Sequence, residues 1–82
     1  MNKFEYDKIT PGTSIDEIEE QIGKPYKVIP EKDGSVTLQY VERIEVGPGI
    51  VELRLYTLHT SEGKVIEKDC KVNSGSVDFR IN

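Results

Sequence analysis

The sequence feature that most constrains the fold is a pair of long alternating segments joined by a glycine-proline turn. Residues 36–46, VTLQYVERIEV, alternate apolar and polar side chains, which is the pattern of a strand with one buried face. The residues Gly47, Pro48 and Gly49 follow, and a second alternating segment occupies residues 50–60. The sequence therefore predicts a long antiparallel β-hairpin.

The second segment of this hairpin changes phase along its length. Close to the turn its apolar residues occupy odd positions, ending with Leu55, and farther along they occupy even positions, starting with Tyr56. A β-bulge near Leu55 and Tyr56 would restore a single buried face, and it would lie opposite Glu42. Glu42 is the polar exception on the expected core face of the first segment, which carries Val36, Leu38, Tyr40, Ile44 and Val46. We therefore expect a bulge there, with a strand buried locally on both faces as the alternative.

Shorter segments are expected to extend the sheet. Strand-like patterns occupy residues 26–29, 64–72 and 77–81, and turn residues lie at 61–63 and 73–75. The first of these segments is either a short strand or an extended connector. In the segment 64–72 the expected inward residues are Ile66, Cys70 and Val72, and in the segment 77–81 they are Val77, Phe79 and Ile81.

A helix is predicted from residue 15 to residue 22. Ser14 is its expected N-cap, and Glu17 three residues later completes the pattern of a capping box. An apolar stripe at helical spacing consists of Ile15, Ile18 and Ile22. Gly23 suits the left-handed position that ends a helix, and Pro25 prevents continuation.

The first residues predict one or two further helical turns. Residues 2–9 have Asn2 as an acceptable N-cap. Phe4 and Ile9 are expected to turn inward, with Tyr6 as a further candidate. The expected fold class is α+β, with one or two short N-terminal helices packed on one face of a three- to four-stranded antiparallel meander sheet. Residues 1–82 are interpreted as a single domain, with a helical layer at 2–23 and an antiparallel sheet at 26–81.

Composition argues against several classes of function. The chain has 82 residues and a net charge of −4, and its Lys and Arg residues are scattered among acids, so nucleic-acid binding is not expected. Its single cysteine, Cys70, excludes an internal disulfide and a cysteine cluster for zinc. No apolar run is long enough to cross a bilayer.

Catalysis is also not expected, and we predict neither a catalytic, a cofactor nor a metal site. Acidic residues on the predicted helix, such as Glu17, would be solvated there, so their pKa values would not be separated. His59 has no partner that can be argued from spacing. The Gly-Pro-Gly sequence is a hairpin turn, and its proline lacks an N–H for a phosphate.

The sheet face away from the helices is the remaining candidate for function. It is expected to carry Thr37, Gln39, Val41, Arg43, Glu45, Glu52, Arg54, Thr57, His59, Glu67, Asp69, Lys71, Asp78 and Arg80. One interpretation is an ordinary solvated face. The other is a protein-binding platform, in which arginine and apolar residues carry the affinity. The candidate contact residues are Val41, Arg43, Arg54 and His59.

The N-terminal segment FEYDKITPGTSIDEIEEQIGKP resembles the signature of the SmpA/OmlA family of small bacterial outer-membrane lipoproteins. The matching residues are Phe4, Ile9, Gly12, Ser14, Ile18, Ile22, Gly23 and Pro25. That family includes an accessory component of the machinery that assembles outer-membrane β-barrels. Its fold group contains proteins resembling β-lactamase inhibitor domains, which bind partners through a sheet face. The lipid-bearing cysteine of the family is not in this sequence, and Cys70 cannot replace it.

The resemblance implies a non-enzymatic protein-binding module of the bacterial cell envelope that assists outer-membrane protein assembly or envelope integrity. The alternative is a soluble inhibitor or immunity-type protein that blocks a partner enzyme through its open sheet face. The expected partners are other proteins, with membrane contact only through a lipid anchor absent from this chain, and the chain is expected to be a monomer or weak homodimer. The location is the periplasm or the inner face of the outer membrane if an export signal precedes Met1, and otherwise the cytoplasm.

Overall fold

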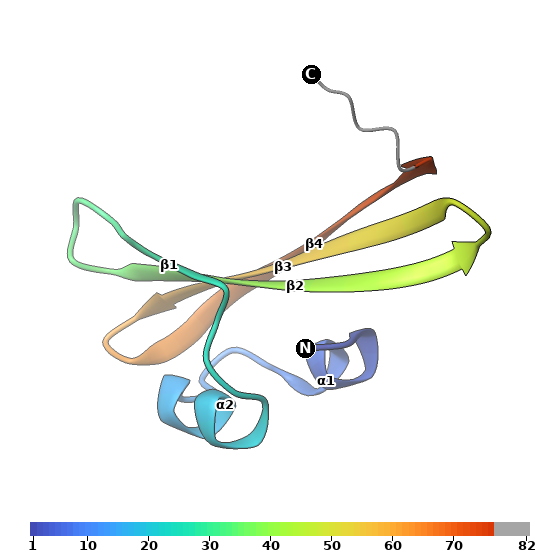
Figure 1. Cartoon of the computed structure of the whole chain (residues 1–82). Coiled ribbons are helices and arrows are strands. Elements are labelled where there is room, and N and C mark those ends of the chain that lie inside the picture. Colours follow the sequence, from blue (N-terminus) through green and yellow to red (C-terminus); the bar gives the residue numbers. More distant parts are fainter. Residues whose placement is uncertain (77–82) are drawn as a thin grey trace.

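Residues 1–76 are the part of the chain that the computed structural model describes, and they form two helices and four strands (Figure 1). The elements are α1 (Lys3–Lys8), α2 (Ile15–Gln21), β1 (Lys27–Pro30), β2 (Val36–Gly47), β3 (Ile50–Ser61) and β4 (Lys64–Ser76). The strands lie in chain order in one sheet, and neighbouring strands are antiparallel. Both helices lie on the same side of the sheet. The predicted α+β class and meander sheet are confirmed.

Each helix begins at a side-chain cap. The Asn2 carboxamide oxygen accepts from the Glu5 N–H at 2.8 Å, and the Glu5 carboxylate accepts from the Asn2 N–H at 2.9 Å, so a complete capping box starts α1. At α2 the Ser14 hydroxyl oxygen accepts from the Glu17 N–H at 3.1 Å. The reciprocal hydrogen bond, from the Ser14 N–H to the Glu17 carboxylate, is absent within residues 1–76. Only half of the capping box predicted there is therefore formed. The helix ends as expected, since Gly23 has a φ of +111°.

The core lies between the helices and one half of the sheet. We call this the proximal half, because it is the end at which β2 pairs with β1, and the hairpin turn at Pro48 lies at the other, distal end. The core consists of Tyr6, Ile9, Ile18, Leu38, Tyr40, Tyr56, Leu58 and Val65. The rings of Tyr6 and Tyr56 pack against each other with their centroids 5.1 Å apart and their planes tilted by 40°. The Tyr40 hydroxyl donates to the Gly23 carbonyl at 2.7 Å and ties the end of α2 to the sheet.

The prediction that Phe4 turns inward is wrong, because its side chain is 68% exposed. Tyr6 and Ile9 are the buried residues of this segment. Residues two apart in a helix lie on different faces, so burying Tyr6 against the sheet turns Phe4 away from it. The Lys8 ammonium lies 4.3 Å from the centre of the exposed Phe4 ring.

The β-bulge predicted near Leu55 and Tyr56 is also wrong. Pairing of β2 with β3 runs without interruption until it reaches the pair Glu45–Val51. A register shift occurs between Glu45 and Gly47, next to the hairpin turn, and another lies between β3 and β4. The apolar residues near the turn therefore stay on the opposite face from Tyr56, as the two-sided alternative implies.

The last described strand differs from the prediction at two places. β4 continues through residues 73–75, where a turn is predicted, because Asn73 and Gly75 pair with β3. The register shift at His59 and Thr60 brings Val65 into the core at 1% exposure and leaves Ile66 57% exposed, so the predicted inward position of Ile66 is wrong. The predicted strand at 77–81 lies outside the described residues.

The connection between the helices also pairs with the sheet. The Gly12 N–H donates to the Val65 carbonyl at 2.7 Å, and the Val65 N–H donates to the Thr13 carbonyl at 2.8 Å. Ser14 forms an isolated bridge with Lys64. This short connection covers the outer edge of β4 where that strand begins.

Candidate protein-binding surface

The register of the strands divides the sheet into two faces. Side chains directly opposite each other in antiparallel strands share a face, and successive residues alternate between faces. The pair Tyr40–Tyr56 faces the helices, which lie on one side of the sheet in Figure 1. We call the other side the open face. Its described residues on β2, β3 and β4 are Thr37, Gln39, Val41, Arg43, Glu45, Val51, Leu53, Leu55, Thr57, His59, Glu67, Asp69, Lys71 and Asn73.

A continuous apolar row occupies the centre of the open face. It follows β3 through Val51, Leu53 and Leu55, and Val41 lies opposite Leu55 on β2. We call these four residues the apolar stripe. Val51 is buried, Leu53 and Leu55 are half-buried, and Val41 is 41% exposed. Leu53 and Leu55, expected inward, therefore lie half-buried on the open face, whereas Val51 on the same face is buried.

Charged and polar residues flank the apolar stripe on both sides. On β2, Arg43 lies opposite Leu53, and its guanidinium lies 3.5 Å from the Glu45 carboxylate. On β4, Lys71 lies opposite Leu55, and Asn73 lies opposite Leu53. The open face therefore has an apolar centre and a polar rim, which is the usual arrangement of a protein interface.

The predicted contact residues are divided between the two faces. Val41, Arg43 and His59 lie on the open face as expected. Arg54 lies opposite Glu42 on the helix-bearing face, so its predicted place on the open face is wrong. The same holds for Glu52, whose carboxylate accepts from the Arg54 side chain at 2.9 Å. Without a bulge, residue 54 stays on the same face as Tyr56.

Glu42 and Arg54 form part of a polar cluster around the hydroxyl of Tyr56. The hydroxyl donates to the Glu42 carboxylate at 2.6 Å, and the Arg54 guanidinium lies 3.9 Å from the same oxygen. Burial, followed by the bond to Glu42, raises the pKa of Tyr56 to about 12. Glu42 is thus an acceptor for a buried hydroxyl, which accounts for a carboxylate on the core face.

His59 has partners that lie far from it in the sequence and meet it through the register of the strands. The Thr37 hydroxyl donates to the Glu31 carboxylate at 2.8 Å, and its oxygen lies 3.2 Å from Nδ1 of His59. The Thr37 hydroxyl therefore links the His59 ring to the Glu31 carboxylate. Counting outward from Pro48 pairs residue 37 with residue 59, so the hairpin alone could have revealed this contact.

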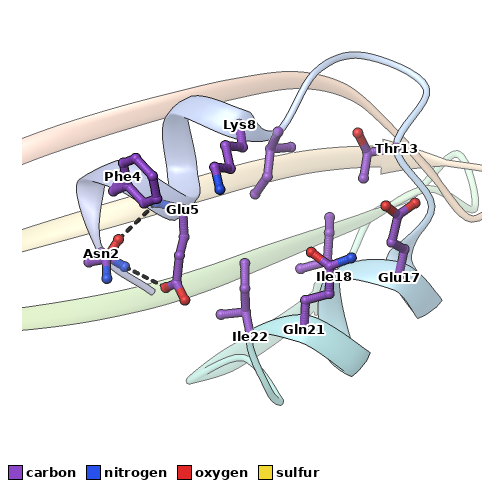
Figure 2. A pocket seen from close by; sticks show the side chains of 10 residues that line it. Asn2, Phe4, Glu5, Lys8, Thr13, Glu17, Ile18, Gln21 and Ile22 are labelled. Carbon is purple, nitrogen blue, oxygen red and sulfur yellow. Dashed lines mark hydrogen bonds between the residues drawn. The ribbon is translucent and has the colours of Figure 1, made fainter.

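A hollow lies on the helix side, between α1 and α2 (Figure 2). It has a volume of about 300 Å³ and is lined by Asn2, Phe4, Glu5, Lys8, Ile9, Thr13, Glu17, Ile18, Gln21 and Ile22. The capping box of Asn2 and Glu5 forms part of its wall, as Figure 2 shows. Its volume corresponds to the lower end of the range for small-molecule sites, about 300–1,000 Å³.

Within residues 1–76 no three His, Cys, Asp or Glu side chains gather to hold a metal ion. No helix in the same range has the length and apolar character needed to cross a membrane.

Comparison with protein-family models, with curated proteins and with solved structures gives no match.

Proposed function

We propose that this protein is a non-enzymatic protein-binding module and that its contact surface is the open face. The observation that carries the proposal is the apolar stripe at the centre of a face that the helices leave uncovered. Leu53 and Leu55 are not packed under α1 or α2, because Tyr56 and Leu58 occupy that side. Apolar residues surrounded by a charged rim can be desolvated by a partner while the rim selects it.

A role in the bacterial cell envelope is part of the same proposal, with the protein acting as an assembly or scaffolding module. Its support is the resemblance of the N-terminal segment to the SmpA/OmlA signature. In this structure Ser14, Ile18 and Gly23 serve as a cap, a core residue and a helix end. These residues position the helical layer, so they leave the open face available for contact.

The test uses two valines on opposite faces of the sheet. Val41 belongs to the apolar stripe, whereas Val28 lies opposite Leu38 on the helix-bearing face and is 53% exposed. The immobilised protein and its Val41→Glu and Val28→Glu variants are incubated with separate envelope and cytoplasmic extracts of the source cells. We expect a specific partner from the envelope extract that Val41→Glu loses and Val28→Glu retains. Equal loss or equal retention by the two variants would contradict a contact through the open face.

The inhibitor alternative uses the same face and differs in its partner. It predicts stoichiometric inhibition of an enzyme encoded beside this protein, and Arg43→Glu should abolish that inhibition. Arg54→Glu is no longer an equivalent test, because Arg54 lies in the polar cluster on the helix-bearing face. A partner that comes only from the cytoplasmic extract and is inhibited at one-to-one ratio would support this alternative over the envelope role.

A further inference from the structure

We infer that the outer edge of β4 pairs with β4 of a second copy of this chain, antiparallel and with the two Cys70 residues opposite each other. β4 has 13 residues, and within residues 1–76 no strand lies outside it. The connection at Gly12 and Thr13 covers this edge at Val65, and within residues 1–76 no other segment pairs with the edge backbone beyond Val65. A long uncovered edge strand is a template for another strand.

The opposite edge of the sheet is less suited to pairing. β1 has only four residues and ends at Pro30, which has no N–H to donate. Short strands and proline are among the ways in which proteins protect sheet edges. Of the two edges, β4 therefore offers the longer run of backbone groups.

Charge selects the register of the pairing. In an antiparallel pair that continues the sheet, a two-fold axis places one residue of β4 opposite its own copy. An axis at Asp69 or at Lys71 would place like charges directly opposite each other, which is destabilising. An axis at Cys70 places Asp69 opposite Lys71 of the second copy, and this ion pair occurs twice. Both side chains are exposed on the open face, so they are available for it.

The covered beginning of β4 agrees with this register. Gly12 and Thr13 occupy the place beside Val65, so the two strands pair around Cys70 over residues 67–73 and diverge toward their ends. An axis at Asp69 would press the second strand closer to that connection. The pairing goes beyond the proposed function and also affects it, because the open faces of both copies then lie on the same side of one continuous sheet.

The first test is a charge exchange, measured by sedimentation equilibrium of the full chain. Asp69→Lys or Lys71→Asp alone replaces two attractive pairs by two repulsive ones. Each should therefore raise the dissociation constant of the dimer roughly tenfold to a hundredfold. The double variant restores both pairs with reversed polarity and should return the dimer. Circular dichroism confirms that each variant is folded. A monomer at all concentrations, or single variants that dimerise as strongly as the unchanged chain, would overturn the proposal.

The second test locates the axis with the single cysteine. A short bismaleimide linker should join two copies of the native protein through Cys70. The yield of cross-linked dimer should fall in urea. The control carries Cys70→Ser and Val72→Cys, which places the two thiols about 14 Å apart in the inferred register. Equal cross-linking of both proteins, or dimers that survive charge reversal, would instead indicate another occupant or register.

Discussion

The hydrogen bond between Tyr56 and Glu42 makes the stability of the fold depend on pH in the alkaline range. Tyr56 is 0% exposed, and its pKa is raised to about 12, whereas an unperturbed tyrosine has a pKa of about 10. A raised pKa means that the native state favours the neutral hydroxyl more than the unfolded chain does. This contribution to the free energy of unfolding is therefore complete below about pH 10 and is lost as the pH rises to about 12.

The size of the effect follows from the pKa difference. Two pKa units correspond to at most about 3 kcal/mol. The hydroxyl of Tyr56 lies in a part-buried polar cluster beside Arg54, so solvent screening reduces the figure to about 1–2 kcal/mol. A small domain has a total stability of only about 5–10 kcal/mol, and such a loss is readily measured.

The assay is urea unfolding of the native protein and of Tyr56→Phe, followed by circular dichroism at about pH 9 and about pH 11.5. The phenylalanine keeps the ring that packs against Tyr6 and removes the titrating group. All other side chains are the same in the two proteins, so the difference between them isolates Tyr56. The native protein should lose about 1–2 kcal/mol more than the variant. Equal losses would refute the coupling between Tyr56 ionisation and the fold.

Predictions for four further variants concern the helical layer, and all are measured by urea unfolding at neutral pH. Ile18→Ala should cost about 2–5 kcal/mol because Ile18 is 2% exposed, whereas Phe4→Ala should cost less than about 1 kcal/mol because Phe4 is 68% exposed. Asn2→Ala removes the cap of α1 and should cost about 0.5–2 kcal/mol. Tyr40→Phe removes the bond to the Gly23 carbonyl and should cost about 0.5–1.5 kcal/mol. A Phe4 variant as unstable as the Ile18 variant would contradict the observed orientation of α1.

Features with a local cause could be predicted from the sequence. The cap at Ser14, the helix end at Gly23 and the turn at Pro48 each depend on a few neighbouring residues, and all three occur in the structure. The alternation of β2 likewise identifies its core face through Leu38 and Tyr40.

The face presented by β3 could not be predicted in this way. Periodicity assumes that a strand buries one face along its whole length, but the helices cover only the proximal half. Tyr56 and Leu58 are buried beneath them, whereas Ile50 on the same face near the turn is 42% exposed. In the distal half of β3, Leu53 and Leu55 therefore lie on the open face, and Arg54 takes the side expected for them.

Only part of the candidate site could be predicted from the sequence, because the face that β3 presents could not. Val41, Arg43 and His59 follow from the alternation of β2 and β3, and the structure places them on the open face. Leu53 and Leu55 were assigned to the core by the expected bulge, so the centre of the surface was missed. The orientation of Phe4 was missed because a helix of six residues has too little periodicity to identify its buried side.

The pairing of Gly12 and Thr13 with Val65 has a consequence for the order in which the chain folds. Each hairpin of the meander joins neighbours in sequence, but the N-terminal layer is fastened to β4, and the Lys68 ammonium donates to the Tyr6 carbonyl across 62 positions. Contacts between such distant residues form late, because closing the intervening loop costs entropy. During synthesis the helical layer emerges first, yet it must wait for the last described strand before it can dock.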